Sequence, residues 1–183
     1  MKLEATSISG VFVSEATPHS DERGYFARVF CKREFAKTGF SGDWVQINHS
    51  HNKLAGTFRG FHYQLPPSEE TKLIRCVSGA ITDFVLDLRQ GSETFLKTLA
   101  VELSPQNQRM ILVPPGVAHA FLTLADNSDV IYHHSQFYDK DLERGVRHDD
   151  PTIAFKVPAQ VRVISERDRS HALLPANFGG ITL

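Results

Sequence analysis

Five residues combine a side chain suited to proton transfer or charge stabilisation with a place in or beside an apolar stretch: His62, Lys72, His119, Tyr132 and Asp168. A histidine exchanges protons near neutral pH, a carboxylate can orient it, and lysine or tyrosine can stabilise or protonate a reacting group. The set is therefore suited to general acid–base catalysis. Each residue also has a plain structural interpretation, because strand histidines often pack half-buried and isolated charges are commonly solvated or cap helices.

The spacing within two segments predicts which side chains lie together. The segment Arg59–Gln64 (RGFHYQ) is typical of a strand, and alternate residues of a strand share a face. Gly60, His62 and Gln64 should then point the same way. Tyr132 and His134 should share a face in the same manner.

Other chemistries have weaker support. His49 and His51 would share one face of a strand, but no third ligand lies near them in the sequence, so we predict no zinc or iron site. The stretch His62–Gln64 contains a single histidine and therefore lacks the second histidine of an H-x-H metal-binding arrangement. The hydrolase motif G-x-S-x-G, the dinucleotide motif G-x-G-x-x-G and the P-loop are all absent.

Short apolar stretches with alternating polarity must position these residues. The ranges predicted as strands are 10–14, 25–30, 44–48, 73–77, 80–88, 98–103, 109–113, 119–124 and 129–132. Turns such as Ser78-Gly79 and Pro114-Pro115-Gly116 separate them, and the second of these turns leads into His119. A helix is predicted over Lys32–Thr38, ended by Gly39, and a second short helix near the C-terminus. Many short strands at regular spacing predict a β-sandwich or barrel.

Composition limits the classes of protein. Of the 183 residues 41% are hydrophobic and 22% are charged, a balance that lets a single domain, residues 1–183, bury a full core. The formal net charge of −1 provides no general attraction for nucleic acid, so none is expected as a partner. Cys31 and Cys76 lie in apolar surroundings and indicate reduced thiols, hence the cytoplasm. No signal-peptide-like or membrane-spanning apolar segment is found.

The sequence resembles the dTDP-4-dehydrorhamnose 3,5-epimerase family from Gly10 to about Leu174. The motifs that carry the resemblance are DERGYF (21–26), QINHS (46–50), RGFHYQ (59–64), KLIRCVSGAITDFVLDLR (72–89), PPGVAHAFLTL (114–124) and SERD (165–168). The resemblance implies an all-β, cupin-type jelly roll with a few short helices, no metal or other cofactor, and a homodimer that exchanges strands. The implied activity is inversion of C3 and/or C5 of a dTDP-4-keto-6-deoxyhexose.

The resemblance also implies roles for individual residues. His62 is similar to the general base, Asp168 to the acid that orients it, Tyr132 to the proton donor on the opposite sugar face, and Lys72 to the cation beside the 4-keto oxygen. Tyr138 resembles an aromatic residue that stacks on the nucleotide base. The remaining substrate-contact positions are Arg23, Phe26, Arg28, Gln46, Asn48, Arg59, His119, Glu143 and Arg167. These roles agree with the chemistry of enolate formation, which needs a base near neutral pKa and a cation at the oxygen.

Two positions depart from the family pattern. Arg28 stands where a glutamate that contacts the nucleotide is common, and His148 stands where an aromatic residue is common. Four alternatives stay open beside the main interpretation: a single-centre epimerase, an epimerase of a CDP-linked sugar, a sugar-binding cupin without catalytic activity and, with the least support, a metal-dependent cupin oxygenase. The paired base and acid favour an enzyme over a binding protein, because binding alone needs neither.

Overall fold

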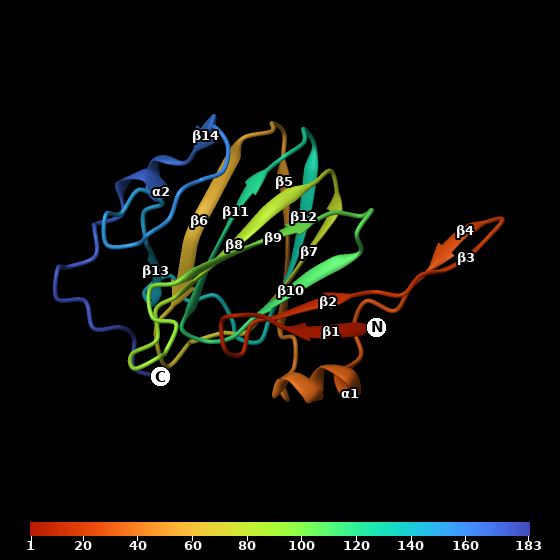
Figure 1. The fold of residues 1–183 in the computed structure, drawn as a ribbon, viewed down its shortest axis with the longest axis horizontal. Helices are drawn as coiled ribbons and strands as arrows, with labels where there is room; N and C mark the ends of the chain where they lie inside the picture. The colour runs from red at the N-terminus through yellow and green to blue at the C-terminus, as the bar shows by residue number, and fades with distance from the viewer.

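The computed structural model describes residues 1–183 and consists mainly of antiparallel strands in two sheets (Figure 1). The first sheet has six strands, in the spatial order β1 (Lys2–Ala5), β2 (Phe12–Glu15), β10 (Arg109–Val113), β7 (Lys72–Ser78), β12 (Ser128–His134) and β5 (Gln46–Asn52). The second sheet has the order β13 (Glu143–Gly145), β6 (Thr57–Gln64), β11 (Val117–Thr123), β8 (Ile81–Asp87) and β9 (Thr98–Leu103), and β14 (Val163–Ile164) pairs with β6 in parallel. The predicted β-sandwich is confirmed.

Alternating apolar residues hold the two sheets together. Ile74 and Ile111 of the first sheet form one buried cluster with Val85, Leu103 and Phe121 of the second sheet. A second cluster lies on the other side of the second sheet, where the C-terminal segment after β13 covers the strands. These two layers of buried side chains fix the position of the second sheet, and burial of their apolar surface is the main stabilising contribution to the fold.

Both predicted helices are present. The first is α1 (Lys32–Phe35), continued by the 3₁₀ turn η1 (Ala36–Thr38), and Gly39 ends it with a φ of 88°, a left-handed conformation that glycine adopts without strain. The second is α2 (Glu166–Ser170). No helix is long and apolar enough to cross a membrane.

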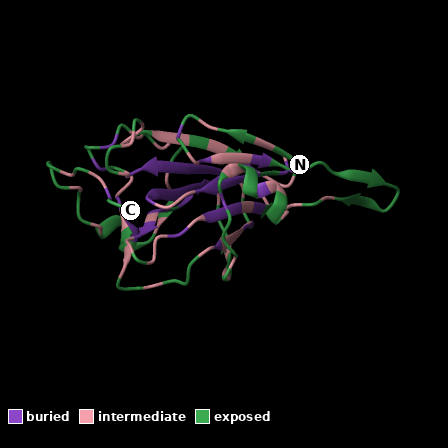
Figure 2. Cartoon of the chain, turned by 90° about the horizontal axis from the view of Figure 1, so that it is seen from below, coloured by how far each residue is buried: buried purple, intermediate pink, exposed green.

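The structure of residues 25–30 differs from the single strand that the sequence predicted there. Strand β4 (Gly24–Phe26) ends early and pairs only with β3 (His19–Asp21), in a hairpin that projects away from the sandwich (Figure 1). Figure 2 shows that this hairpin is exposed throughout. The extended prediction fails because Val29 and Phe30 turn back to pack in the cluster below the first sheet.

A β-bulge in β6 changes which residues share a face. His119 of β11 lies opposite His62, whereas Phe121 lies opposite Arg59, so three steps along β6 match two steps along β11. The extra residue reverses the alternation, and Arg59 therefore joins His62 and Gln64 on the pocket side. The prediction that Gly60 continues the same alternation is wrong for this reason.

Candidate active site

A cavity of about 290 Å³ opens between the two sheets, at the end where β5, β7 and β12 face β6 and β11. Most of the residues that line it are polar or charged, although the strands that carry them also supply the apolar core. The residues around it are Asn48, His49, Ser50, Arg59, His62, Tyr63, Gln64, Glu70, Lys72, His119, Phe121, Tyr132, His134, Tyr138 and Glu143. Eight of the predicted site residues are thus brought together in one cavity: Asn48, Arg59, His62, Lys72, His119, Tyr132 and, at its rim, Tyr138 and Glu143.

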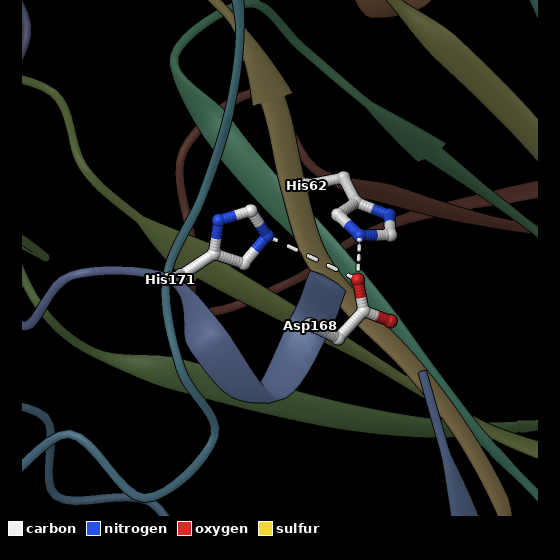
Figure 3. A group of neighbouring side chains, drawn as sticks. All are labelled: His62, Asp168 and His171. Atoms are coloured by element: carbon white, nitrogen blue, oxygen red, sulfur yellow. Dashed lines mark hydrogen bonds and ion pairs between the residues drawn. The ribbon is translucent and has the colours of Figure 1, made fainter. Parts of the chain in front are cut away.

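His62 is oriented by Asp168. Its Nε2 lies 2.7 Å from Asp168 Oδ1 (Figure 3), and because an ionised carboxylate can only accept, Nε2 carries the hydrogen. Nδ1 is then the nitrogen free to take a proton. Ser165, the N-cap of α2, accepts a hydrogen bond of 3.0 Å from the Asp168 backbone N–H and fixes the helix turn that carries the carboxylate.

The environment of Asp168 keeps it ionised. Burial by itself would raise its pKa, but hydrogen bonds from His62 and from the Gly60 backbone N–H, at 3.3 Å, bring the pKa below its usual value.

A second histidine–carboxylate pair differs from His62–Asp168. His119 Nε2 lies 2.7 Å from Asp83 Oδ2, but complete burial raises the pKa of Asp83. Of the two pairs, only His62–Asp168 combines a carboxylate whose pKa is lowered with an imidazole that reaches solvent: the His62 side chain is 30% exposed and that of His119 is 5% exposed.

Tyr132 faces the pocket from the opposite sheet. It lies on β12 of the first sheet, whereas His62 lies on β6 of the second. Burial, and then the nearby Asp83 carboxylate, raises the pKa of Tyr132, so its hydroxyl stays protonated at neutral pH. As predicted, His134 shares its face, with the ring centroids 6.0 Å apart.

Lys72 is held at the floor of the pocket by a buried carboxylate. Its Nζ lies 3.0 Å from Glu70 Oε1 and 3.4 Å from the backbone oxygen of His62. The other oxygen of Glu70 accepts a hydrogen bond of 2.5 Å from His134 Nδ1. The ammonium group therefore stays near the base within a fixed network, and its charge is partly balanced.

The rim of the pocket carries a second network of predicted residues. Tyr138 donates its hydroxyl to Glu143 at 2.6 Å, and Glu143 also forms an ion pair with Arg167. Gln46 accepts from the Tyr138 backbone N–H at 3.2 Å and donates to Asn48 at 3.1 Å. This network places an exposed aromatic ring beside the mouth of the cavity.

Three predicted contact residues lie outside the pocket of their own chain. Arg23 and Phe26 belong to the projecting β3–β4 hairpin, where Phe26 is 76% exposed and Arg23 pairs with Asp21. Arg28 lies after the hairpin and forms an ion pair of 3.3 Å with Glu34. The departure at His148 has a packing consequence, because its ring contacts that of Phe58 with centroids 5.1 Å apart.

The structure adds three residues that were not predicted for the site: Glu70, Asp83 and His171. Asp83 had a usable signal, since it is a charged residue within the otherwise apolar stretch 80–88. Glu70 lies two residues before Lys72, and only the turn between β6 and β7 brings it into the cavity. His171 follows α2 and has no sequence signal of its own.

Two clusters of histidine and carboxylate side chains lie in or beside the pocket. His62, Asp168 and His171 each present one nitrogen or oxygen atom within 4.8 Å of the others, but the hydrogen bond between His62 and Asp168 already uses two of these three atoms. The bond of 2.7 Å between His62 and Asp168 is also the length expected for a directly hydrogen-bonded base and its orienting acid. His49 and His51 share a face as predicted, and both contact Asp129 Oδ1 at 2.9 Å.

Fold and pocket together define a class: a cupin-type jelly roll whose inter-sheet cavity holds an oriented imidazole on one sheet and a protonated tyrosine on the other. Comparison with known proteins narrows this class. The model of the dTDP-4-dehydrorhamnose 3,5-epimerase family matches residues 5–176. The dTDP-4-dehydrorhamnose 3,5-epimerase of Shigella flexneri is 38% identical over 169 residues, which are 92% of this chain and 93% of the relative.

Solved structures of similar fold belong to the same family of epimerases. The dTDP-4-dehydrorhamnose 3,5-epimerase of Bacillus anthracis, crystallised with TDP and PPi bound, matches with a TM-score of 0.90 and 36% identity, over 94% of this chain and 99% of that one. ChmJ, a 3'-monoepimerase from Streptomyces bikiniensis in complex with dTDP-quinovose, matches with a TM-score of 0.84 and 30% identity, over 92% and 85%. The chain belongs to the dTDP-4-dehydrorhamnose 3,5-epimerase family and is a sugar-nucleotide epimerase, an isomerase; the predicted family and fold class are confirmed.

Proposed function

We propose that this enzyme inverts C3 and C5 of a dTDP-4-keto-6-deoxyhexose, with His62 as the base and Tyr132 as the opposed acid. The observation that carries the proposal is that these side chains come from facing sheets, so that a sugar ring between them meets one on each face. Asp168 orients the base and Lys72 supplies the cation.

The first step is removal of a proton from the carbon next to the ketone. Nδ1 of His62 takes the proton while Nε2–H stays bonded to Asp168, whose negative charge stabilises the imidazolium that forms. The electron pair left on carbon moves into an enolate, and the charge collects on the keto oxygen. Lys72, fixed by Glu70, is the cation available to stabilise that oxygen.

The second step returns a proton to the opposite face of the carbon. Tyr132 supplies it, because its raised pKa keeps the hydroxyl protonated until carbanion character develops nearby. Proton loss on one face and gain on the other inverts the centre. His62 then releases its proton to solvent and Tyr132 takes one up from solvent, and a second cycle at the other carbon next to the ketone inverts C5.

We further propose that the active enzyme is a homodimer in which the β3–β4 hairpin of one protomer reaches the pocket of its partner. The hairpin carries Arg23 and Phe26, and its Tyr25 hydroxyl accepts a hydrogen bond of 2.9 Å from Gln108 of its own chain. Strand β5 is a free edge of the first sheet, beside the pocket, and its Ile47 is 62% exposed. A hairpin added at this edge would cover it and bring an arginine to the pyrophosphate.

The dimer has a direct test. Light scattering should give twice the chain mass of 20.5 kDa, and deletion of 19–26 should lower activity together with affinity for dTDP. Mixing the Arg23→Ala and His62→Ala variants should restore part of the activity, because some mixed dimers contain one intact site. A fully active monomer would contradict the proposal.

The activity itself is tested by incubating the protein with dTDP-4-keto-6-deoxyglucose in D2O and following the sugar carbons by NMR. We expect deuterium at C3 and C5 and the product with both centres inverted. The likeness to ChmJ supports one alternative, a single-centre epimerase, for which deuterium would enter at one carbon with inversion.

The free thiols of Cys31 and Cys76 support the reducing cytoplasm as the place of action.

A further inference from the structure

His171 is a second imidazole beside the carboxylate that orients the base. Its Nε2 lies 3.9 Å from Asp168 Oδ1, the same oxygen that accepts the hydrogen bond from His62 (Figure 3). The two imidazole rings lie edge to face, with centroids 6.2 Å apart. Asp168 therefore has an imidazole nitrogen on two sides.

The His171 ring packs directly against the backbone at Gly145. A Cβ added at Gly145, which lies opposite His62 in the β13–β6 pairing, would fall 2.1 Å from His171 Nε2. The ring thus occupies the space that a side chain at residue 145 would need. Its Nε2 is buried and has no hydrogen-bond partner, and the Asp168 carboxylate 3.9 Å away favours the tautomer that has the hydrogen on Nε2.

Charge determines what this ring does to the base. Burial, and then the nearby His62, lowers the pKa of His171 and so favours the neutral form of its ring. A neutral His171 ring with a hydrogen on Nε2 points that hydrogen at Asp168 Oδ1 and partly offsets the negative charge of the Asp168 carboxylate. Less charge is then left to stabilise the imidazolium form of His62.

We propose that His171 is a positioning residue of the reaction, which shares Asp168 with His62 and thereby sets the lower end of the pH range in which His62 works as a base. The inference rests on the proposed role of His62. The other groups facing His171 are Asp168 and Arg167 of α2 and Glu143 of β13. Arg167 and Glu143 form an ion pair with each other, so the carboxylate of Asp168 is the free charge that the two imidazoles divide.

Two variants of similar size separate this role from simple packing. His171→Gln keeps an N–H donor that does not titrate, and His171→Leu fills the same space without a donor, so neither admits water to Asp168. The acid limb of the kcat/KM profile in His171→Leu should move to higher pH by about half a unit, because the full carboxylate charge then favours protonated His62. The limb of His171→Gln should stay within about 0.2 units of wild type.

The titration of the His62 ring, followed by NMR without substrate, should show the same difference. Equal titration curves in wild type and both variants would overturn the proposal and leave the role of His62 untouched. Equal shifts in both variants would also overturn it, because packing alone would then explain them. A His62 ring that shifts while the kinetic limb does not would show that His62 is not the base, and would remove the proposed function together with this inference. Thermal unfolding and dTDP binding confirm that each variant is folded.

Discussion

The space between the two sheets has an apolar end and a polar end, and the same strands line both. On β7, Lys72 faces the pocket, and Ile74 and Cys76 on the same face lie in the buried apolar cluster. On β12, Val130 is in that cluster, and Tyr132 and His134 are in the pocket. The comparison teaches that one alternating pattern sets the inward positions, and that a change of residue type along each strand divides them into core and site.

The largest expected effect is at the polar end. His62→Ala should lower kcat by at least about a hundredfold, the usual contribution of a general base. The ring is partly exposed and lies outside the apolar cluster, so the variant should fold and still bind dTDP. Steady-state kinetics and calorimetric titration with dTDP check both points; near-normal turnover in a variant that binds dTDP would assign the base elsewhere.

A matched pair on β7 tests whether the two ends are separable. Lys72→Met should lower kcat about 10²-fold or more through loss of the cation at the oxyanion, with the protein still folded. Ile74→Ala should cost about 2–4 kcal/mol of unfolding free energy, because it leaves a cavity in a fully buried cluster, while kcat of the folded enzyme changes little. Urea unfolding and kinetics at low temperature measure the two quantities. Equal loss of both in each variant would mean that core and site are one unit.

The two carboxylates of the site should give opposite pH trends in stability. The pKa of Asp168 is lowered in the folded state, so its contribution is present above the usual carboxyl range and is lost as the pH falls through the lowered pKa. The pKa of Asp83 is raised by burial, so its contribution is largest at low pH and declines as the pH rises through the raised value.

Denaturation of wild type, Asp168→Asn and Asp83→Asn across the acid range tests this. The advantage of wild type over Asp168→Asn should shrink on acidification, and its advantage over Asp83→Asn should shrink as the pH rises. Parallel trends for the two variants would contradict the difference in environment between the two pairs.

The smallest expected effect concerns Arg28, which lies outside both ends of the inter-sheet space. An arginine can donate to the N3 acceptor of cytosine, whereas a glutamate can accept from the N3–H of thymine, so the departure from the family pattern raises CDP-linked sugars as a second candidate substrate. Its exposed ion pair with Glu34 contributes little to stability. Arg28→Glu should therefore leave the fold unchanged and move preference toward dTDP by up to about tenfold, measured by competition of dTDP and CDP. A wild type that prefers dTDP by the same factor as the variant would exclude a role in base choice.

The strands could be predicted because alternation is a local property of the sequence, and most of the pocket residues could be predicted because their motifs resemble those of the family. His62, Lys72 and Tyr132 were assigned from segments that the sandwich then placed around one cavity. The bulge that turns Arg59 inward has no signal in residue type, because it arises from the pairing of β6 with β11. His171 could not be found either, since its approach to Asp168 depends on how the chain leaves α2 and packs against Gly145.

The central claim is that proton removal and proton return occur from opposite sheets, and Tyr132→Phe tests it most directly. The variant is incubated with dTDP-4-keto-6-deoxyglucose in D2O, and NMR follows deuterium content and configuration together. The account predicts that deuterium enters with the original configuration kept, because His62 can remove and return a proton on its own side, and that net inversion falls by about a hundredfold. Inversion at the normal rate would contradict the account, since the second proton would then come from another donor.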